Sequence, residues 1–97
     1  AERLAKFAGI ANETRRKYAA QLSLMDDAIG AALDALEKSG QSKRTVIFFF
    51  SDNGGPIGTN GNGSINSPLR AGKGSVYEGG VRVPFVVRWT GRAIVPA

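Results

Sequence analysis

The clearest pattern along the chain is helical and lies between residues 18 and 36. Apolar side chains recur there at steps of three or four residues, at Tyr18, Leu22, Met25, Ile29, Leu33 and Leu36. This spacing places them on one face of a helix. Ser39-Gly40 then provides a stop, because glycine tolerates the left-handed conformation at a helix end. We therefore predict a long amphipathic helix with Tyr18 and Met25 in a core. Residues 1–16 show a looser spacing that indicates a short helix or a lead-in.

Two short apolar runs follow the predicted helix. The first, TVIFFF at residues 45–50, is continuous, β-branched and aromatic. Because successive side chains of a strand point to opposite faces, this run needs cover on both faces, which is typical of a strand buried in a parallel sheet. The second run, residues 83–89, predicts another strand, with Pro84 confined to its start.

The strands are separated by residues 51–74, a segment without periodicity that is dense in glycine and asparagine. Loops this long in compact domains are usually functional or disordered. Helix, strand, long loop and strand make an α/β arrangement with a partial parallel-type sheet, in which ligands gather at the carboxyl ends of strands. One helix and two strands cannot cover both faces of residues 45–50, so we expect part of a larger domain.

Composition adds one departure from ordinary globular values. The 97 residues are 42 % hydrophobic and 22 % charged, but nine of the 13 glycines lie between Gly54 and Gly80. A chain of this length supports one modest core. No apolar run approaches the ~18 residues of a membrane span, so none is predicted, and residues 1–10 lack the apolar region of a signal peptide.

The net charge of +5 belongs to the second part of the chain. Residues 1–38 hold six basic and six acidic side chains, whereas residues 39–97 hold seven basic and two acidic ones. A basic, glycine-rich surface suits an anion such as phosphate, sulfate or nucleic acid, and a solvated surface that is merely basic explains the excess equally well. We expect no nucleic-acid partner, because Phe and Tyr are not interleaved with the basic residues as base stacking requires.

The chain has no cysteine and no histidine. Without cysteine it contains no disulfide, no thiolate metal site and no cysteine nucleophile. Without histidine it lacks the commonest general base and any imidazole ligand. Catalytic sets that depend on either residue are therefore excluded for this chain as it stands.

Asp52 and Asn53 come directly after the first predicted strand and before Gly54-Gly55. They offer a carboxylate and an amide oxygen on adjacent residues, which are donors that a hard cation such as Ca²⁺ prefers. The alternative is a plain Asx turn, in which such side chains bond their own backbone. The pair by itself favours the turn.

Lys73 is the second candidate. Its neighbours Gly72 and Gly74 would let the backbone approach a ligand closely while the ammonium reaches that ligand as a mobile point charge. Ser75 and Glu78 fit a capping box, which predicts a helical turn just after Lys73 with free N–H groups aimed at the same anion. Taken alone, a turn of this kind is more often structural.

Three blocks occur in order along the chain: YAAQLSLMDDAIGAALDALEKSG, TVIFFFSDNGG and NSPLRAGKGSVYEGGVRVPFVVRW. They resemble the later part of the catalytic domain of the sulfatase (arylsulfatase) family, within the alkaline phosphatase superfamily. The resemblance covers about residues 17–91, and LRAGKGSVYEGGVRVP is its most specific part. It implies that residues 1–97 are a partial sulfatase catalytic domain, a fragment of a larger alkaline-phosphatase-like fold from an enzyme that hydrolyses sulfate esters.

The resemblance also implies roles for three residues. Asp52 and Asn53 match the pair that supplies oxygen ligands to the family's active-site Ca²⁺, and Lys73 matches the lysine that contacts the substrate sulfate. The family's nucleophile is a formylglycine made from the first residue of a C/S-x-P-S-R motif. Residues 66–70, NSPLR, have asparagine at that place. The chain is thus expected to contribute metal-binding and sulfate-binding residues and to be inactive alone.

Two alternatives stay open. The nucleophile motif normally separates sulfuryl from phosphoryl ester hydrolases of the superfamily, so a phosphoryl ester hydrolase is the first. The second is a noncatalytic remnant that covers its apolar strand with a second copy, as a homo-oligomer or swapped dimer. The residues present specify no particular sulfate ester, and members of the family are often periplasmic, secreted or lysosomal.

Overall fold

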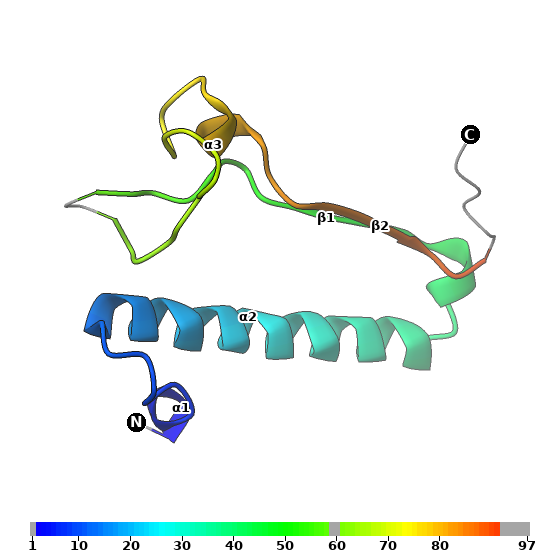
Figure 1. Cartoon of the computed structure of the whole chain (residues 1–97). Helices are drawn as coiled ribbons and strands as arrows, with labels where there is room; N and C mark the ends of the chain where they lie inside the picture. The colour runs from blue at the N-terminus through cyan, green and yellow to red at the C-terminus, as the bar shows by residue number, and fades with distance from the viewer. Residues whose placement is uncertain (1, 59–60, 92–97) are drawn as a thin grey trace.

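The computed structural model describes residues 2–58 and 61–91 (Figure 1). Its elements are, in chain order, α1 (Glu2–Ala5), α2 (Glu13–Lys38), the 3-10 helix η1 (Ser42–Arg44), β1 (Val46–Phe50), α3 (Glu78–Val81) and β2 (Phe85–Trp89). In these described ranges, no helix combines the length and apolar content needed to cross a membrane.

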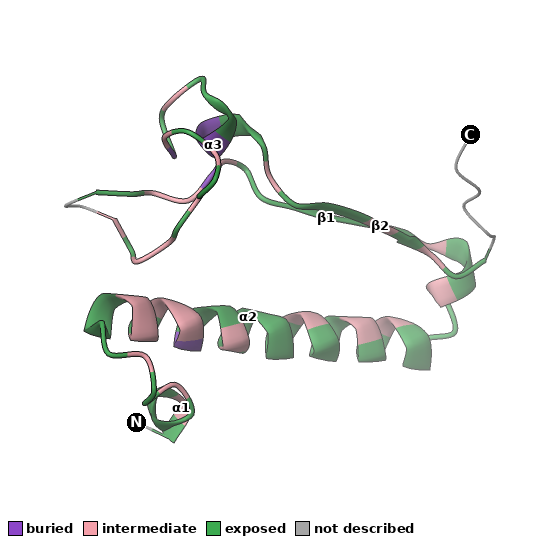
Figure 2. Cartoon of the chain, viewed as in Figure 1, coloured by how far each residue is buried: buried purple, intermediate pink, exposed green. Residues whose placement is uncertain are grey.

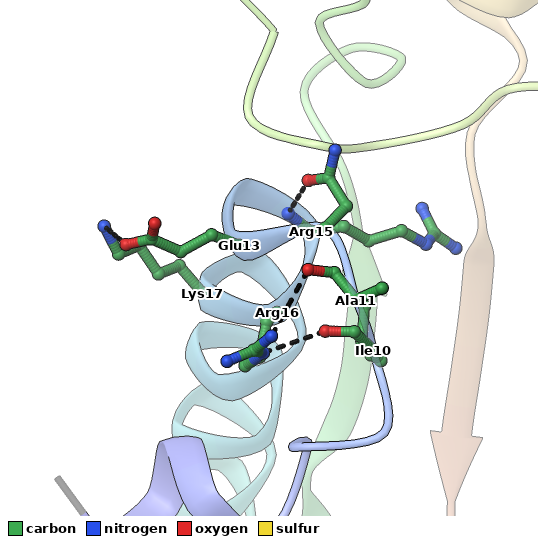
Figure 3. A network of polar contacts seen from close by, with 7 residues as sticks. Ile10, Ala11, Glu13, Arg15, Arg16 and Lys17 are labelled. Carbon is green, nitrogen blue, oxygen red and sulfur yellow. Dashed lines mark hydrogen bonds and ion pairs between the residues drawn. The ribbon is translucent and has the colours of Figure 1, made fainter.

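The predicted long helix is present as α2 and begins before the first apolar position, Tyr18. Asn12 caps its start, because the Oδ1 atom accepts a hydrogen bond from the backbone N–H of Arg15 at 2.9 Å (Figure 3). One turn further on, Lys17 lies 2.6 Å from the Glu13 carboxylate. The hydrogen bond and the charge of Lys17 lower the pKa of Glu13. These polar contacts extend the helix beyond the part that apolar periodicity indicates.

Arginine side chains connect the lead-in segment to α2. Arg16 donates from Nε to the carbonyl of Ile10 at 2.8 Å and from Nη2 to that of Ala11 at 3.3 Å (Figure 3). Arg3, on α1, forms an ion pair with Asp27 in the middle of α2. The described residues before α2 contain one helical turn, α1, and residues 13–16 already belong to α2 itself. An ion pair links α1 to α2.

The two predicted strands form an antiparallel pair, with Val46 opposite Trp89 and Phe50 opposite Phe85. The expectation of parallel strands is therefore wrong for this pair. A parallel connection needs a crossover, usually a helix packed on the sheet. The described chain between β1 and β2 has only α3, which is four residues long and lies at the end of the strands (Figure 1). The loop consequently turns back, and β2 returns directly beside β1.

Both faces of this hairpin are apolar. By strand alternation Ile47 and Phe49 share the face toward α2, and Phe48 and Phe50 share the opposite one. The Phe85 ring lies 6.2 Å from the ring of Phe48 and 5.7 Å from that of Phe50. Phe48 and Phe50 are nevertheless 59 % and 58 % exposed, and Figure 2 shows the strands largely uncovered. The cover that such a strand needs is not supplied by the described residues.

α2 runs along the hairpin without closing a core against it (Figure 1). A cleft of about 930 Å³ separates them. It is lined mostly by apolar side chains of α2, β1 and β2, with the polar side chains of Ser23, Asp26 and Arg88 among them. Met25 lines it and is 45 % exposed, so its predicted place in a core is wrong for this chain. Among the described residues Ala20 is the one buried apolar side chain. The radius of gyration, 16.8 Å, exceeds the ~12.5 Å of a compact chain of this length.

Candidate functional site

Two loops meet at the end of the hairpin where β1 ends, next to α3 (Figure 1). The backbone N–H of Gly54 donates to the carbonyl of Gly80 at 2.9 Å, and the backbone N–H of Lys73 donates to the carbonyl of Gly55 at 3.2 Å. These bonds hold the segment that carries residues 52–53 beside the segment that carries Lys73. The candidate residues of the sequence are thereby brought to one end of the sheet.

Glycine makes this close approach possible. A Cβ atom on Gly54 would lie 2.7 Å from the carbonyl carbon of Gly79 and still closer to its oxygen, and one on Gly80 would lie 2.7 Å from the carbonyl oxygen of Gly72. Neighbouring backbone cannot move aside as the tip of a side chain can, so no side chain fits at these positions. We call this set the glycine junction; its members are Gly54, Gly55, Gly72, Gly79 and Gly80.

Asp52 and Asn53 follow β1 with their side-chain oxygens uncommitted. Asp52 is exposed, and within residues 2–58 and 61–91 its carboxylate has no hydrogen bond or ion pair. The Nδ2 of Asn53 donates to the carbonyl of Gly54 at 3.2 Å, and the hydroxyl of Ser51 donates to the carbonyl of Asn53 at 2.8 Å. In an Asx turn a side-chain oxygen would accept from the backbone. Here the local bonds leave both side-chain oxygens available to a ligand.

Lys73 is exposed and lies between two glycines that have different structural roles. Gly72 is buried in the glycine junction, and Gly74 adopts a φ of +87°. Ala71 also has a positive φ, 63°, which is uncommon for a residue with a side chain. This tight path carries the lysine around the outside of the junction. In the described part of the chain its ammonium has no hydrogen bond or ion pair.

The predicted capping box does not form. α3 begins at Glu78, its N-cap position is Tyr77, and no side chain caps it. The backbone N–H of Ser75 donates to the carbonyl of Gly72 at 3.1 Å, so this serine is held inside a tight turn and not at a helix start. Its Oγ is buried without a partner among the described residues. The expectation that a helix starts just after the lysine and shares its anion is therefore wrong.

The other charged side chains of these two loops and α3 have partners. The guanidinium carbon of Arg70 lies 3.7 Å from the centre of the Tyr77 ring, a favourable stacking of a cation on an aromatic face. Arg82 lies 3.6 Å from Glu78, as the sequence spacing suggests. Of the charged side chains that these two loops and α3 carry in the described ranges, Asp52 and Lys73 are the two without a partner. The glycine junction lies between the segments that carry them.

A complete metal site is not present in the part of the chain that the structure describes. No three acidic, histidine or cysteine side chains gather there. Calcium takes about six to eight oxygen ligands, of which residues 52–53 have the right chemistry to supply two. The arrangement can offer two oxygen ligands to a cation and one ammonium, unpaired among the described residues, to an anion.

One side chain that joins the two loops was not indicated by the sequence. The backbone N–H of Gly55 donates to the Oδ1 of Asn66 at 3.2 Å, and the Nδ2 of Asn66 donates to the carbonyls of Gly55 at 2.8 Å and Ala71 at 3.0 Å. The one signal in the sequence was that Asn66 stands at the start of the third block. In other respects nothing distinguishes it from the other asparagines of this polar loop.

Comparisons with known proteins agree on one family. The family model described as Sulfatase matches residues 2–93. The chain is 42 % identical over 86 residues to a sulfatase of Formosa agariphila and 38 % identical over 78 residues to the N-acetylgalactosamine-6-sulfatase of Mus musculus. These alignments cover 80 % and 79 % of this chain and 15 % of each relative. The chain therefore spans about 15 % of the length of these curated relatives.

The fold agrees as well. In the crystal structure of Ps i-CgsB in complex with k-i-k-neocarrahexaose, a segment 43 % identical in sequence superposes with a TM-score of 0.84. It covers 92 % of this chain and 19 % of that one. The family model, the relatives and the superposed structure each match most of this chain, and the chain belongs to the sulfatase family.

Proposed function

We propose that this chain contributes two metal ligands and one sulfate-binding cation to a site that hydrolyses a sulfate ester. The observation that carries the proposal is the pair of charged groups, Asp52 and Lys73, that lack partners among the described residues while their charged neighbours have them. Fixed charges that are already in place before substrate arrives are what stabilises charge developing in a transition state.

Each of the three residues has a separate task in this proposal. Asp52 and Asn53 present a carboxylate and an amide oxygen that would hold Ca²⁺, which supplies positive charge to the sulfate oxygens when bound. The ammonium of Lys73 binds the sulfate from the adjoining loop and neutralises part of its charge. The nucleophile and the proton-transfer groups are not among these residues, since the chain has neither cysteine nor histidine.

The lysine provides the direct test. In the protein expressed from its complete reading frame, Lys73→Met is expected to lower kcat/KM for an aryl sulfate about 100-fold, because one positive contact to the transition state is lost. Lys43→Met is the matched control. Lys43 belongs to η1 at the other end of the hairpin, so its loss should change kcat/KM less than about twofold. Unchanged hydrolysis in Lys73→Met would refute the assignment.

The names of the relatives span sulfated N-acetylgalactosamine and steryl sulfates, so a generic aryl sulfate is the appropriate first substrate. Aryl phosphate should be assayed beside it with the same enzyme. A larger kcat/KM for the phosphate would favour the phosphoryl ester hydrolase.

A second prediction concerns the 97 residues alone. Purified as such, they are expected to release no product from an aryl sulfate above the rate of a buffer blank. The reason is chemical, because the chain lacks a cysteine to become formylglycine and a histidine to transfer protons. Turnover that co-purifies with the chain through two different columns would contradict this prediction.

A further inference from the structure

The carboxamide of Asn66 occupies the space between the two loops of the candidate site. Its oxygen accepts from the backbone N–H of Gly55, and its nitrogen donates to the carbonyl of the same residue, so it binds Gly55 as a neighbouring strand would. The second proton of the nitrogen goes to the carbonyl of Ala71, two residues before Lys73. One planar group thus joins the metal-ligand loop to the lysine loop.

The surroundings of this amide leave no room for adjustment. A Cβ atom on Gly72 would lie 2.7 Å from the Nδ2 of Asn66 and still closer to the carbonyl oxygen of Gly55. The carbonyl of Gly55 also accepts from the backbone N–H of Lys73 at 3.2 Å. Asn66, Gly55 and Gly72 therefore form one packed layer. The backbone of Lys73 is hydrogen-bonded directly to Gly55 of this layer.

The hydrogen-bond pattern requires an amide. It uses one acceptor and both protons of a single NH₂ group, a combination that among side chains of this length belongs to asparagine. Aspartate has the same shape but would set a carboxylate oxygen against the carbonyls of Gly55 and Ala71. The acceptor bond would survive, and both donor bonds would become repulsive contacts.

We infer that Asn66 is the positioning residue that fixes the Lys73 ammonium relative to Asp52 and Asn53. This inference rests on the proposed function, because it assigns a purpose to the spacing between those residues. A displacement of about 1 Å in a catalytic group can cost about 100-fold in rate. Loosening the amide should therefore make Lys73 ineffective even though its own side chain is intact.

A double-mutant cycle tests the coupling. In the protein from the complete reading frame, kcat/KM for an aryl sulfate is measured for the parent, Asn66→Asp, Lys73→Met and the double variant. Lys73→Met should cost about 100-fold in the parent and less than about fivefold in the Asn66→Asp background, because the lysine is already misplaced there. A purely structural asparagine would lower activity without changing the cost of Lys73→Met.

The outcomes separate the two ideas. If Lys73→Met leaves kcat/KM unchanged in the parent, the proposed function fails. If it costs the expected factor equally in both backgrounds, the inference about Asn66 is overturned and the proposed function stands. Asn62→Asp is the matched control, since Asn62 is an exposed asparagine of the same loop whose oxygen accepts locally from the N–H of Ser64 at 3.1 Å. It adds the same charge and should leave the cycle unchanged.

A measurement on the parent protein covers the case in which Asn66→Asp does not fold. Both Nδ2 protons of Asn66 are hydrogen-bonded, so in nuclear magnetic resonance spectra they should exchange with solvent at least about tenfold more slowly than those of exposed Asn62. Equal exchange rates for the two side chains would overturn the inference without any substitution.

Discussion

Alanine at Gly54 is expected to destabilise the protein by about 4 kcal/mol or more, a cost found for few single substitutions. Gly54 is buried, and its N–H donates to the carbonyl of Gly80. The new methyl group would overlap the carbonyl of Gly79, which is backbone in the middle of the glycine junction. Relief requires the loop after β1 to separate from α3, and the metal-ligand and lysine loops would then lose their common support.

Thermal unfolding and aryl sulfate hydrolysis of the protein from the complete reading frame would measure this effect. Gly30→Ala is the control, because a Cβ at Gly30 meets nothing within 4 Å and the residue lies inside α2. In a helix interior the change from glycine to alanine should stabilise by about 0.5–1 kcal/mol. The prediction fails if Gly54→Ala unfolds at the same temperature as the parent and retains its activity.

Local periodicity was sufficient to predict the long helix and the two strands. The recurrence from Tyr18 to Leu36 indicated α2, and the apolar runs indicated β1 and β2, because these patterns depend on neighbours in the chain. The start of α2 was harder to predict from the sequence, since it depends on the Asn12 cap and on contacts of Arg16 with the preceding segment. Burial along α2 was not predictable either, because it depends on elements that face the cleft.

Strand direction was mispredicted for a related reason. A strand that is apolar on both faces is typical of parallel sheets, and VIFFF of β1 fits that description. The composition of one strand reports how it is covered, however, and does not report the direction of its neighbour. The better signal was the segment between the strands, which has glycine and asparagine where a crossover helix would need an apolar face.

The parts of the candidate site could be predicted from the sequence to different degrees. Asp52, Asn53 and Lys73 stood out by residue type and by resemblance, and the structure brings their loops together. The glycine excess was noticed but interpreted as an irregular loop, whereas Gly54, Gly79 and their partners form a closely packed junction. Such packing depends on contacts between separate segments of the chain, such as that of Gly54 with Gly79 and Gly80, and no local pattern in the sequence indicates them.

Asp52→Asn is the substitution expected to have the largest effect on chemistry. The variant keeps the size of the side chain and one oxygen but removes the charge that a hard cation selects for. In calorimetric titrations of the chelator-treated protein from the complete reading frame, Ca²⁺ affinity is expected to fall about 100-fold. At micromolar Ca²⁺, kcat/KM for an aryl sulfate should fall about 1,000-fold, because the charge balance at the sulfate oxygens is lost as well.

Asp34→Asn removes the same charge from an exposed position on α2 that has no ion pair among the described residues, and it should change neither quantity more than about twofold. Raising Ca²⁺ to millimolar levels separates loss of metal from loss of fold, since a folded variant with weakened affinity recovers part of its activity by mass action. If Asp52→Asn binds Ca²⁺ as the parent does, the residue acts as a turn former. We expect weakened Ca²⁺ binding instead, because the carboxylate at the end of β1 has no partner among the described residues. In a turn former, a side-chain oxygen would accept a hydrogen bond from the backbone.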